Sequence, residues 1–146
     1  MDGGSDGGGS NEDVRKDAVK THVHQMSATS DGKYVTHVLQ LVLESHAKNV
    51  YTIFGASNSA LSIPPAGQIS GFGVNIGGVS PSIWSKVKSA QFDSWLTVGI
   101  TGGDTHNDLA SVGLNFKGWT ARSGLHTTNG AVFWMNPDNG PVGDTA

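Results

Sequence analysis

Two histidines on an extended segment are the first candidate for chemistry in this sequence. His22 and His24 are two residues apart, so both imidazoles project from one face of a strand and could bind a metal ion. His37 on the next extended segment would supply a third nitrogen, as in some catalytic zinc sites. However, His37 lies on the apolar face of its own segment, and no carboxylate has a suitable spacing. The simpler interpretation is that these are ordinary strand histidines.

An acidic turn offers oxygen ligands of the kind that calcium prefers. Asp104, Asn107 and Asp108 fall within five consecutive residues, but the segment lacks the full calcium-loop pattern. Asp and Asn are also common in turns because their side chains hydrogen-bond to the local backbone. We therefore predict no resident cofactor, and calcium at this turn stays open as an alternative.

Motifs for nucleophilic or phosphate chemistry are incomplete. The segment 55–59 (GASNS) fails the nucleophile elbow G-x-S-x-G at its last position. The segment 71–77 (GFGVNIG) misses the dinucleotide-binding spacing and opens no helix. The chain has no cysteine, which excludes thiol chemistry and disulfides. We expect a protein that is not an enzyme.

The tryptophans allow two interpretations. Trp84, Trp95, Trp119 and Trp134 could stack on sugar rings, or they could fill a core or a protein interface. Trp95 is predicted to lie on the outward side of its segment, which suits an interface. Packing or protein contact is the favoured interpretation, and glycan binding is kept as an alternative.

A β-hairpin is the clearest element that would position these residues. Residues 19–27 alternate between two faces, residues 30–33 (SDGK) form an Asp-Gly turn, and residues 34–44 carry apolar side chains at every second position. Further strands are expected at 50–54, 60–63, 92–100, 112–116 and 131–135, with a Gly-rich loop at 66–82 and a helical turn at 83–89. These elements predict an all-β fold, a two-layer antiparallel β-sandwich of about seven short strands with long Gly-rich loops.

Two regions follow from the composition along the chain. Residues 1–18 are predicted to form a flexible Gly/Ser-rich tail or linker, and residues 19–146 a single β domain.

Charged residues make up only 14% of the chain, against roughly 25% in an average soluble protein. The net charge of −3 provides no basic surface for nucleic acid, and no apolar run is long enough to span a membrane. A surface with so little charge favours association between copies.

Three segments carry a resemblance to a known family. Residues 91–99 (QFDSWLTVG), 111–114 (SVGL) and 129–137 (NGAVFWMNP) resemble a β-domain that often occurs in tandem in structural or secreted proteins of marine bacteria and algae, including the pyrenoid shell proteins of diatoms. The resemblance covers roughly residues 50–141. It implies self-assembly into sheets, tubes or filaments, with no catalytic residues. It also implies a location outside the cell or at its surface, or in the plastid.

Together these observations predict a structural protein whose main partner is another copy of itself. The residues expected at the self-association surface are Val19, Thr21, Val23, Gln25, Phe72, Trp84, Trp95 and Trp134. The first strand has Lys20 as its only charge, so its edge is poorly protected against pairing with another chain. The alternative is a calcium-dependent or carbohydrate-binding module of an adhesive surface protein.

Overall fold

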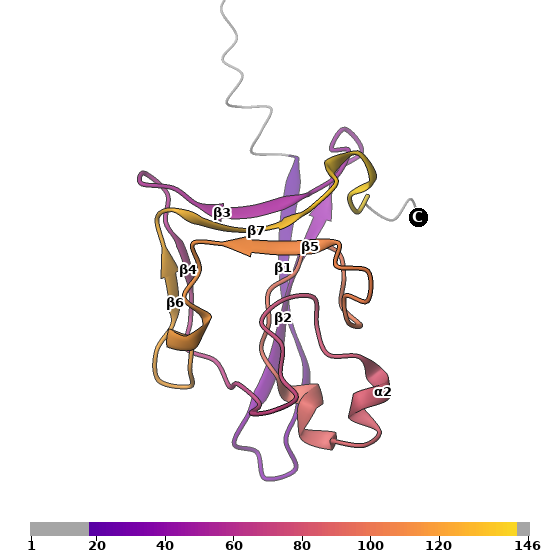
Figure 1. Ribbon diagram of the computed structural model, residues 1–146, viewed down its shortest axis with the longest axis vertical. Coiled ribbons are helices and arrows are strands. Elements are labelled where there is room, and N and C mark those ends of the chain that lie inside the picture. Colours follow the sequence, from indigo (N-terminus) through magenta and orange to yellow (C-terminus); the bar gives the residue numbers. More distant parts are fainter. Residues whose placement is uncertain (1–17, 143–146) are drawn as a thin grey trace, which may run out of the picture.

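Antiparallel strands provide most of the regular structure in the computed structural model, which describes residues 18–142 (Figure 1). The strands are β1 (Val19–Ala28), β2 (Val35–Leu43), β3 (Thr52–Gly55), β4 (Leu61–Ile63), β5 (Leu109–Val112), β6 (Leu125–Thr127) and β7 (Gly130–Trp134). Helical structure is limited to α2 (Pro81–Trp84) and the short 3-10 turns η1 (Lys88–Phe92), η2 (Phe116–Gly118) and η3 (Pro137–Asn139). The all-β prediction is confirmed. Nearly all of the predicted tail lies outside the described residues.

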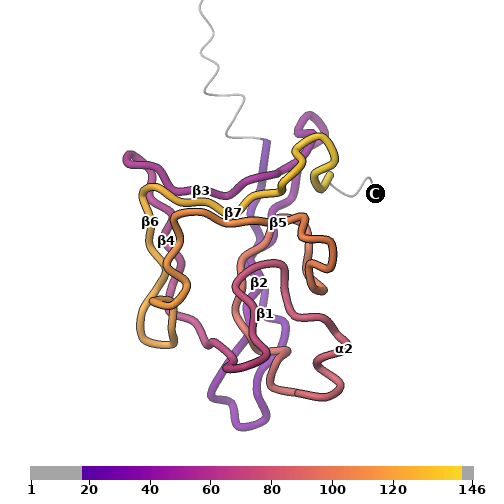
Figure 2. The backbone as a smooth tube through the Cα atoms, in the orientation of Figure 1, coloured from indigo at the N-terminus to yellow at the C-terminus, as the bar shows by residue number. Residues whose placement is uncertain are grey.

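The strands group into three small antiparallel sheets. β1 and β2 form a two-stranded hairpin, β3, β7 and β5 form a three-stranded sheet in that order, and β4 pairs with β6. The long hairpin runs across the direction of β3, β7 and β5, as the ribbon and the backbone tube both show (Figures 1 and 2). The sheets are smaller and more numerous than two continuous layers, and the sandwich arrangement stays a prediction.

The hydrophobic core lies against one face of the three-stranded sheet. Val98, Leu109 and Val132 form its buried centre, and Val132 on the middle strand β7 is fully buried. Partly buried apolar side chains surround this centre, namely Val50, Ile53, Ile76, Leu96, Ile100, Leu114, Phe116 and Trp134. Several of these come from segments without regular structure, so loops supply much of the second layer of the core.

One of these segments corrects the predicted strand at 92–100. Phe92 ends η1, and the only ladder contact of the segment is a bridge between Leu96 and Ile76. The Thr97 hydroxyl contacts the backbone of Ile100, and Gly99 has a φ of 83°, so the chain turns where a strand would continue. The alternation of apolar residues correctly predicts that this segment contributes to the core, since Val98 is buried there. The prediction that the segment is a strand was wrong.

Other boundaries shift by less. The strand expected at 112–116 ends at Val112, because Gly113 has a φ of 66° and the chain then enters η2. The expected strand at 131–135 corresponds to β7, and the loop at 66–82 contains no strand. The expected helical turn at 83–89 is divided between α2 and η1. Strand β6 was not anticipated.

Candidate interaction surfaces

The connection of the β1–β2 hairpin contains the predicted Asp31-Gly32 pair, but it is longer than the predicted turn at 30–33 and spans residues 29–34. Gly32 has a φ of 69°, which favours glycine. The Asp31 carboxylate accepts hydrogen bonds from the Thr29 hydroxyl at 2.6 Å and from the backbone N–H of Lys33 at 3.2 Å. These bonds, above all that from Thr29, hold the pKa of Asp31 below its usual range. The turn therefore stabilises the pairing next to it, of Ala28 with Val35, and an irregularity between Gln25 and Ser27 separates this pairing from the rest of the ladder.

The register divides the hairpin into two faces. Val23 pairs with Leu39 and Thr21 pairs with Leu41, while His24 pairs with Val38 on the opposite face. We call the first set the outward hairpin face: Val19, Thr21, Val23, Gln25, Val35, His37, Leu39, Leu41 and Leu43. Thr36 and Val38 on the other face are half-buried, and so are Val19 and Leu43 at the far end of the outward hairpin face. Near its turn the hairpin therefore directs the other face toward the rest of the protein.

The outward hairpin face is mainly apolar, carries no Lys, Arg, Asp or Glu, and is exposed along its middle. Val23 is 67% exposed and its cross-strand partner Leu39 is 61% exposed. The charged residues of the hairpin, Lys20, Asp31 and Lys33, lie on its other face or in its turn. Among the described strands, β1 and β2 pair only with each other, so each is an edge of this sheet. A two-stranded hairpin is marginally stable alone, so this element gains from any layer that covers its apolar face.

A second exposed apolar face lies on the three-stranded sheet. The side chains of Val132 and Leu109 point into the core, as do those of the residues paired directly beside them on the neighbouring strands. Because side chains alternate along a strand, the residues between these positions point away from the core. We call these residues the outer sheet face: Thr52, Phe54, Ala110, Val112, Ala131 and Phe133. Phe54 and Val112 are each 61% exposed on the two edge strands, and the face carries no charge. The sequence predictions did not single out this face.

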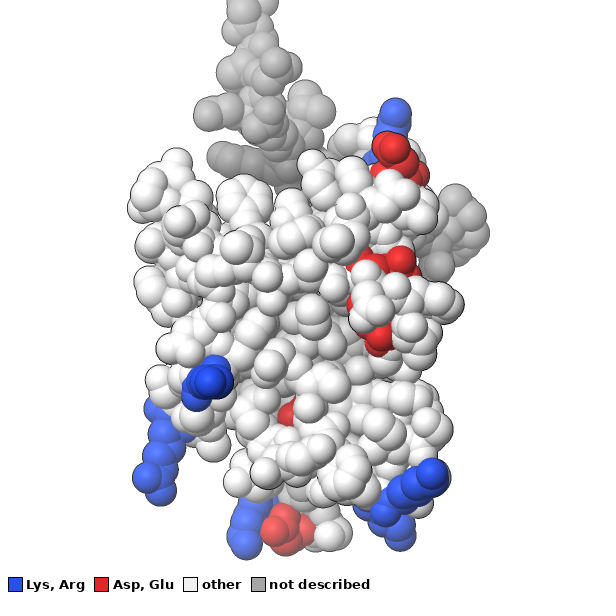
Figure 3. All heavy atoms as spheres, in the orientation of Figure 1, with Lys and Arg blue, Asp and Glu red and all other residues white. Residues whose placement is uncertain are grey.

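The space-filling view shows how little charge this side of the molecule carries. Lys, Arg, Asp and Glu side chains are few and lie mainly toward the margins, with a broad uncharged area between them (Figure 3). This distribution agrees with a charged fraction of 14% for the whole chain. Long-range repulsion between copies is therefore weak.

The residues predicted for self-association fall into separate places. Val19, Thr21, Val23 and Gln25 lie together on the outward hairpin face, as expected from their spacing. Phe72 is 51% exposed in the Gly-rich loop, and Trp84 is 37% exposed at the end of α2. They are not part of either apolar face defined above.

Two of the predicted aromatic residues have packing roles. Trp95 lies over Gly78, where a Cβ atom would come within 3.0 Å of the indole ring. Trp134 packs against the core, and its Nε1 donates a hydrogen bond to Asn139 Oδ1 at 2.9 Å. Trp119 is buried and its Nε1 donates to the Pro64 carbonyl at 2.9 Å. These side chains hold loops to the body of the domain.

The hairpin histidines do not converge. His22 and His24 share the face opposite the outward hairpin face, whereas His37 pairs with Gln25 and lies on the outward side. The pairing register therefore places the imidazole of His37 on the opposite face of the hairpin from the imidazoles of His22 and His24. Within residues 18–142, no three His, Cys, Asp or Glu side chains form a group that could hold a metal ion.

The acidic turn uses its main carboxylate internally. Asp104 Oδ1 accepts the backbone N–H of Asp108 at 3.0 Å, and Oδ2 accepts that of Leu109 at 2.9 Å. Burial raises the pKa of Asp104, but backbone N–H groups of Leu109, Asp108, His106 and Asn107 outweigh it and hold the pKa below its usual value. Asn107 has a φ of 58°, which shapes the same turn. Both carboxylate oxygens thus stabilise the loop, the role that Asp commonly has in turns.

A buried carboxylate, that of Asp93, organises the Gly-rich loop. Asp93 is 5% exposed and accepts the backbone N–H of Ile69 at 2.8 Å and that of Val74 at 2.6 Å. A Cβ atom at Gly73 would lie only 2.6 Å from Asp93 Oδ1, so the loop closes tightly over the carboxylate. Asp93 therefore fixes the conformation of residues 69–74 through these two hydrogen bonds.

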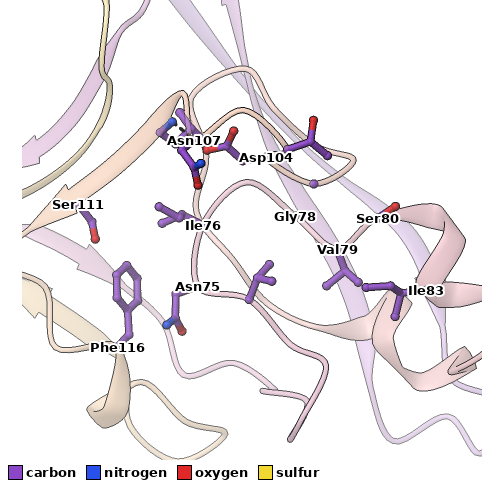
Figure 4. A pocket seen from close by; sticks show the side chains of 14 residues that line it. Asn75, Ile76, Gly78, Val79, Ser80, Ile83, Asp104, Asn107, Ser111 and Phe116 are labelled. Carbon is purple, nitrogen blue, oxygen red and sulfur yellow. Dashed lines mark hydrogen bonds between the residues drawn. The ribbon is translucent and has the colours of Figure 1, made fainter.

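An open pocket of about 550 Å³ lies between the acidic turn and the Gly-rich loop. Asp104 and Asn107 lie toward one end of it and Asn75 and Phe116 toward the other, with Ile76 between them (Figure 4). Asp104 is the only charged residue among those that line the pocket, and its carboxylate is already hydrogen-bonded to the turn. The lining offers amides, hydroxyls and apolar groups, without a paired acid and base.

A further pocket of about 650 Å³ separates the hairpin turn from the body of the domain. Asp31 and Tyr34 line it from the hairpin side, and Lys88 and Phe92 line it from the other. The Tyr34 ring lies over Gly67, where a Cβ atom would be 3.6 Å from the ring. No tryptophan is among the residues that line either pocket. Sugar binding by the tryptophans stays a prediction.

No family model, curated protein or solved structure that was compared with the chain matches it. Between residues 18 and 142, no helix has the length and apolar character needed to cross a membrane.

Proposed function

We propose that this chain is a non-enzymatic structural protein that self-assembles into an ordered sheet, tube or filament, of the type that forms a shell or an extracellular matrix. The observation that carries the proposal is the outward hairpin face, on which Val23 and Leu39 are 67% and 61% exposed. Exposed apolar faces of this kind mark interaction sites in natural proteins. The free edges of β1 and β2 support the same proposal, because unpaired edges accept strands from other chains.

The non-enzymatic part of the proposal is supported by how the carboxylates of the domain body are used. Asp93 and Asp104 both bind backbone N–H groups of their neighbouring loops. These two carboxylates therefore contribute to the conformation of their loops, which supports a structural role for them.

Imaging of the purified full chain tests this proposal. Negative-stain electron microscopy and sedimentation velocity over a wide range of concentrations should reveal regular polymers in equilibrium with a small species. A single monomeric species at every concentration would contradict self-assembly. Binding to a glycan array, or a rise in Tm on adding calcium, would then favour the adhesive module.

A further inference from the structure

Within residues 18–142, two different and mainly apolar sheet faces have exposed side chains. The outward hairpin face exposes Val23 and Leu39, and the outer sheet face exposes Phe54 and Val112. Sheets in β proteins are normally packed face to face, with apolar side chains interdigitating between them. Each face therefore has the chemistry of one half of a sheet-to-sheet contact.

We propose that the outward hairpin face of one copy packs on the outer sheet face of a second copy. This inference rests on the proposed self-assembly and specifies which surfaces meet. Neither face carries Lys, Arg, Asp or Glu, so burying them against each other leaves no unpaired carboxylate, ammonium or guanidinium group. A charged partner surface would be desolvated without compensation on either face, whereas the chain itself offers an uncharged face of the same kind.

The contact is heterologous, because it joins two different surfaces. The hairpin of each copy is engaged by the next copy, while its three-stranded sheet receives the hairpin of the previous one. A heterologous contact that does not close into a ring produces an open polymer. The hairpin runs across the strand direction of the three-stranded sheet within one copy (Figure 1), so the two faces are presented by separate elements.

The size of the hairpin face limits the strength of one contact. A two-stranded ribbon with strands of nine to ten residues is roughly 30 Å long and about 10 Å wide. Such a face is smaller than the roughly 800 Å² per partner that stable pairs bury. A single contact is therefore weak, and assembly depends steeply on concentration. Strand pairing at the free edges of β1 and β2 would add to it within a polymer.

Charge substitutions on each face give a complementation test. Leu39→Lys disables the hairpin face and Phe54→Lys disables the sheet face, and each variant should lose assembly alone. An equimolar mixture should form a dimer that cannot extend, because the intact hairpin of one variant meets the intact sheet of the other. Matched controls are Gln40→Lys on the opposite hairpin face and Asn58→Lys in the exposed turn after β3, and both should assemble as wild type does.

The outcomes separate this contact from the broader proposal. If wild type assembles and Leu39→Lys or Phe54→Lys also assembles alone, the contact is wrong and self-assembly stands. The same conclusion follows if both variants are monomeric and their mixture stays monomeric at total concentrations well above those at which wild type assembles. If wild type is monomeric at every concentration, self-assembly itself is wrong. Val23→Lys and Val112→Lys form a second pair for the same experiment, in case one of the first variants fails to fold.

The absence of native cysteine allows a direct measurement of the contact. Leu39→Cys and Phe54→Cys proteins, mixed and treated with a short bis-maleimide, should give a crosslinked dimer containing one copy of each. Gln40→Cys in place of Leu39→Cys should lose that product. Equal yields from the two pairs would overturn the proposed contact, because the reaction would then report random collisions.

Discussion

Truncating Leu39 to Ala should weaken assembly by an amount that can be worked from the structure. Complete burial of a leucine side chain contributes about 1.5–3 kcal/mol, and Leu39 is 61% exposed before any contact. Covering the exposed part therefore contributes about 1–2 kcal/mol to each contact. Since a tenfold change corresponds to about 1.4 kcal/mol, the Leu39→Ala variant should assemble at a critical concentration about 5–30 times higher.

Sedimentation of the polymer at a series of total concentrations measures this change. The protein left in the supernatant gives the critical concentration, which equals the dissociation constant for adding one copy. Gln40→Ala is the matched control, since it lies next to Leu39 on the opposite face of the hairpin. If Leu39→Ala and Gln40→Ala shift the critical concentration equally, the outward hairpin face is not the surface buried on assembly.

Other predictions concern the loops and the solution conditions. Asp93→Ala should lower the free energy of unfolding by about 1–4 kcal/mol in urea titrations, because two partly buried backbone N–H groups lose their acceptor. Gly78→Ala should lower it by roughly 1–3 kcal/mol, because φ is +79° and the added Cβ would meet Thr101 O. Since the pKa of Asp104 is lowered by folding, its contribution is present above the ordinary carboxylate pKa and is lost as pH falls through the folded value. Wild type should therefore exceed Asp104→Asn in stability at neutral pH, and urea titrations should show the difference closing below roughly pH 4. Raising NaCl from about 0.01 M to about 1 M should not raise the critical concentration, because both proposed faces are uncharged.

The stability experiments need a monomeric background, because assembly raises the apparent stability of the folded chain. Leu39→Lys provides it, and Asp138→Ala serves as an exposed control for the two aspartate variants. A loss at Asp93→Ala no larger than that at Asp138→Ala would show that the Gly-rich loop does not depend on the Asp93 carboxylate. An unchanged gap between wild type and Asp104→Asn at acid pH would contradict the sign argued for Asp104.

The hairpin could be predicted because its determinants are local. Alternating side chains set the two faces, and Asp31-Gly32 sets the turn, all within one continuous segment. β6 was missed for the opposite reason. It has three residues, and its extended form depends on pairing with β4, which is far away in the sequence. Short strands of this kind are specified by tertiary pairing more than by their own pattern.

The segment 92–100 shows where a correct pattern gives a wrong conformation. Its apolar residues do contribute to the core, but they do so from an irregular path that turns at Gly99. The same limit applies to the outer sheet face. Alternation in the strand containing Phe54 separates two faces, but only the position of Val98 and its neighbours shows which of them is covered. The exposed face is thus a property of the packing rather than of the strand.

The position of the few charged groups connects the composition with the proposed assembly. Asp93 and Asp104 bind backbone N–H groups in loops that a Gly-rich sequence could not fix by side-chain packing alone. The charges of the hairpin lie outside its outward face. A low charged fraction by itself would favour indiscriminate association, since nothing would keep copies apart. Two defined uncharged faces on elements of different direction instead favour one contact geometry, and a repeated geometry is what an ordered polymer requires.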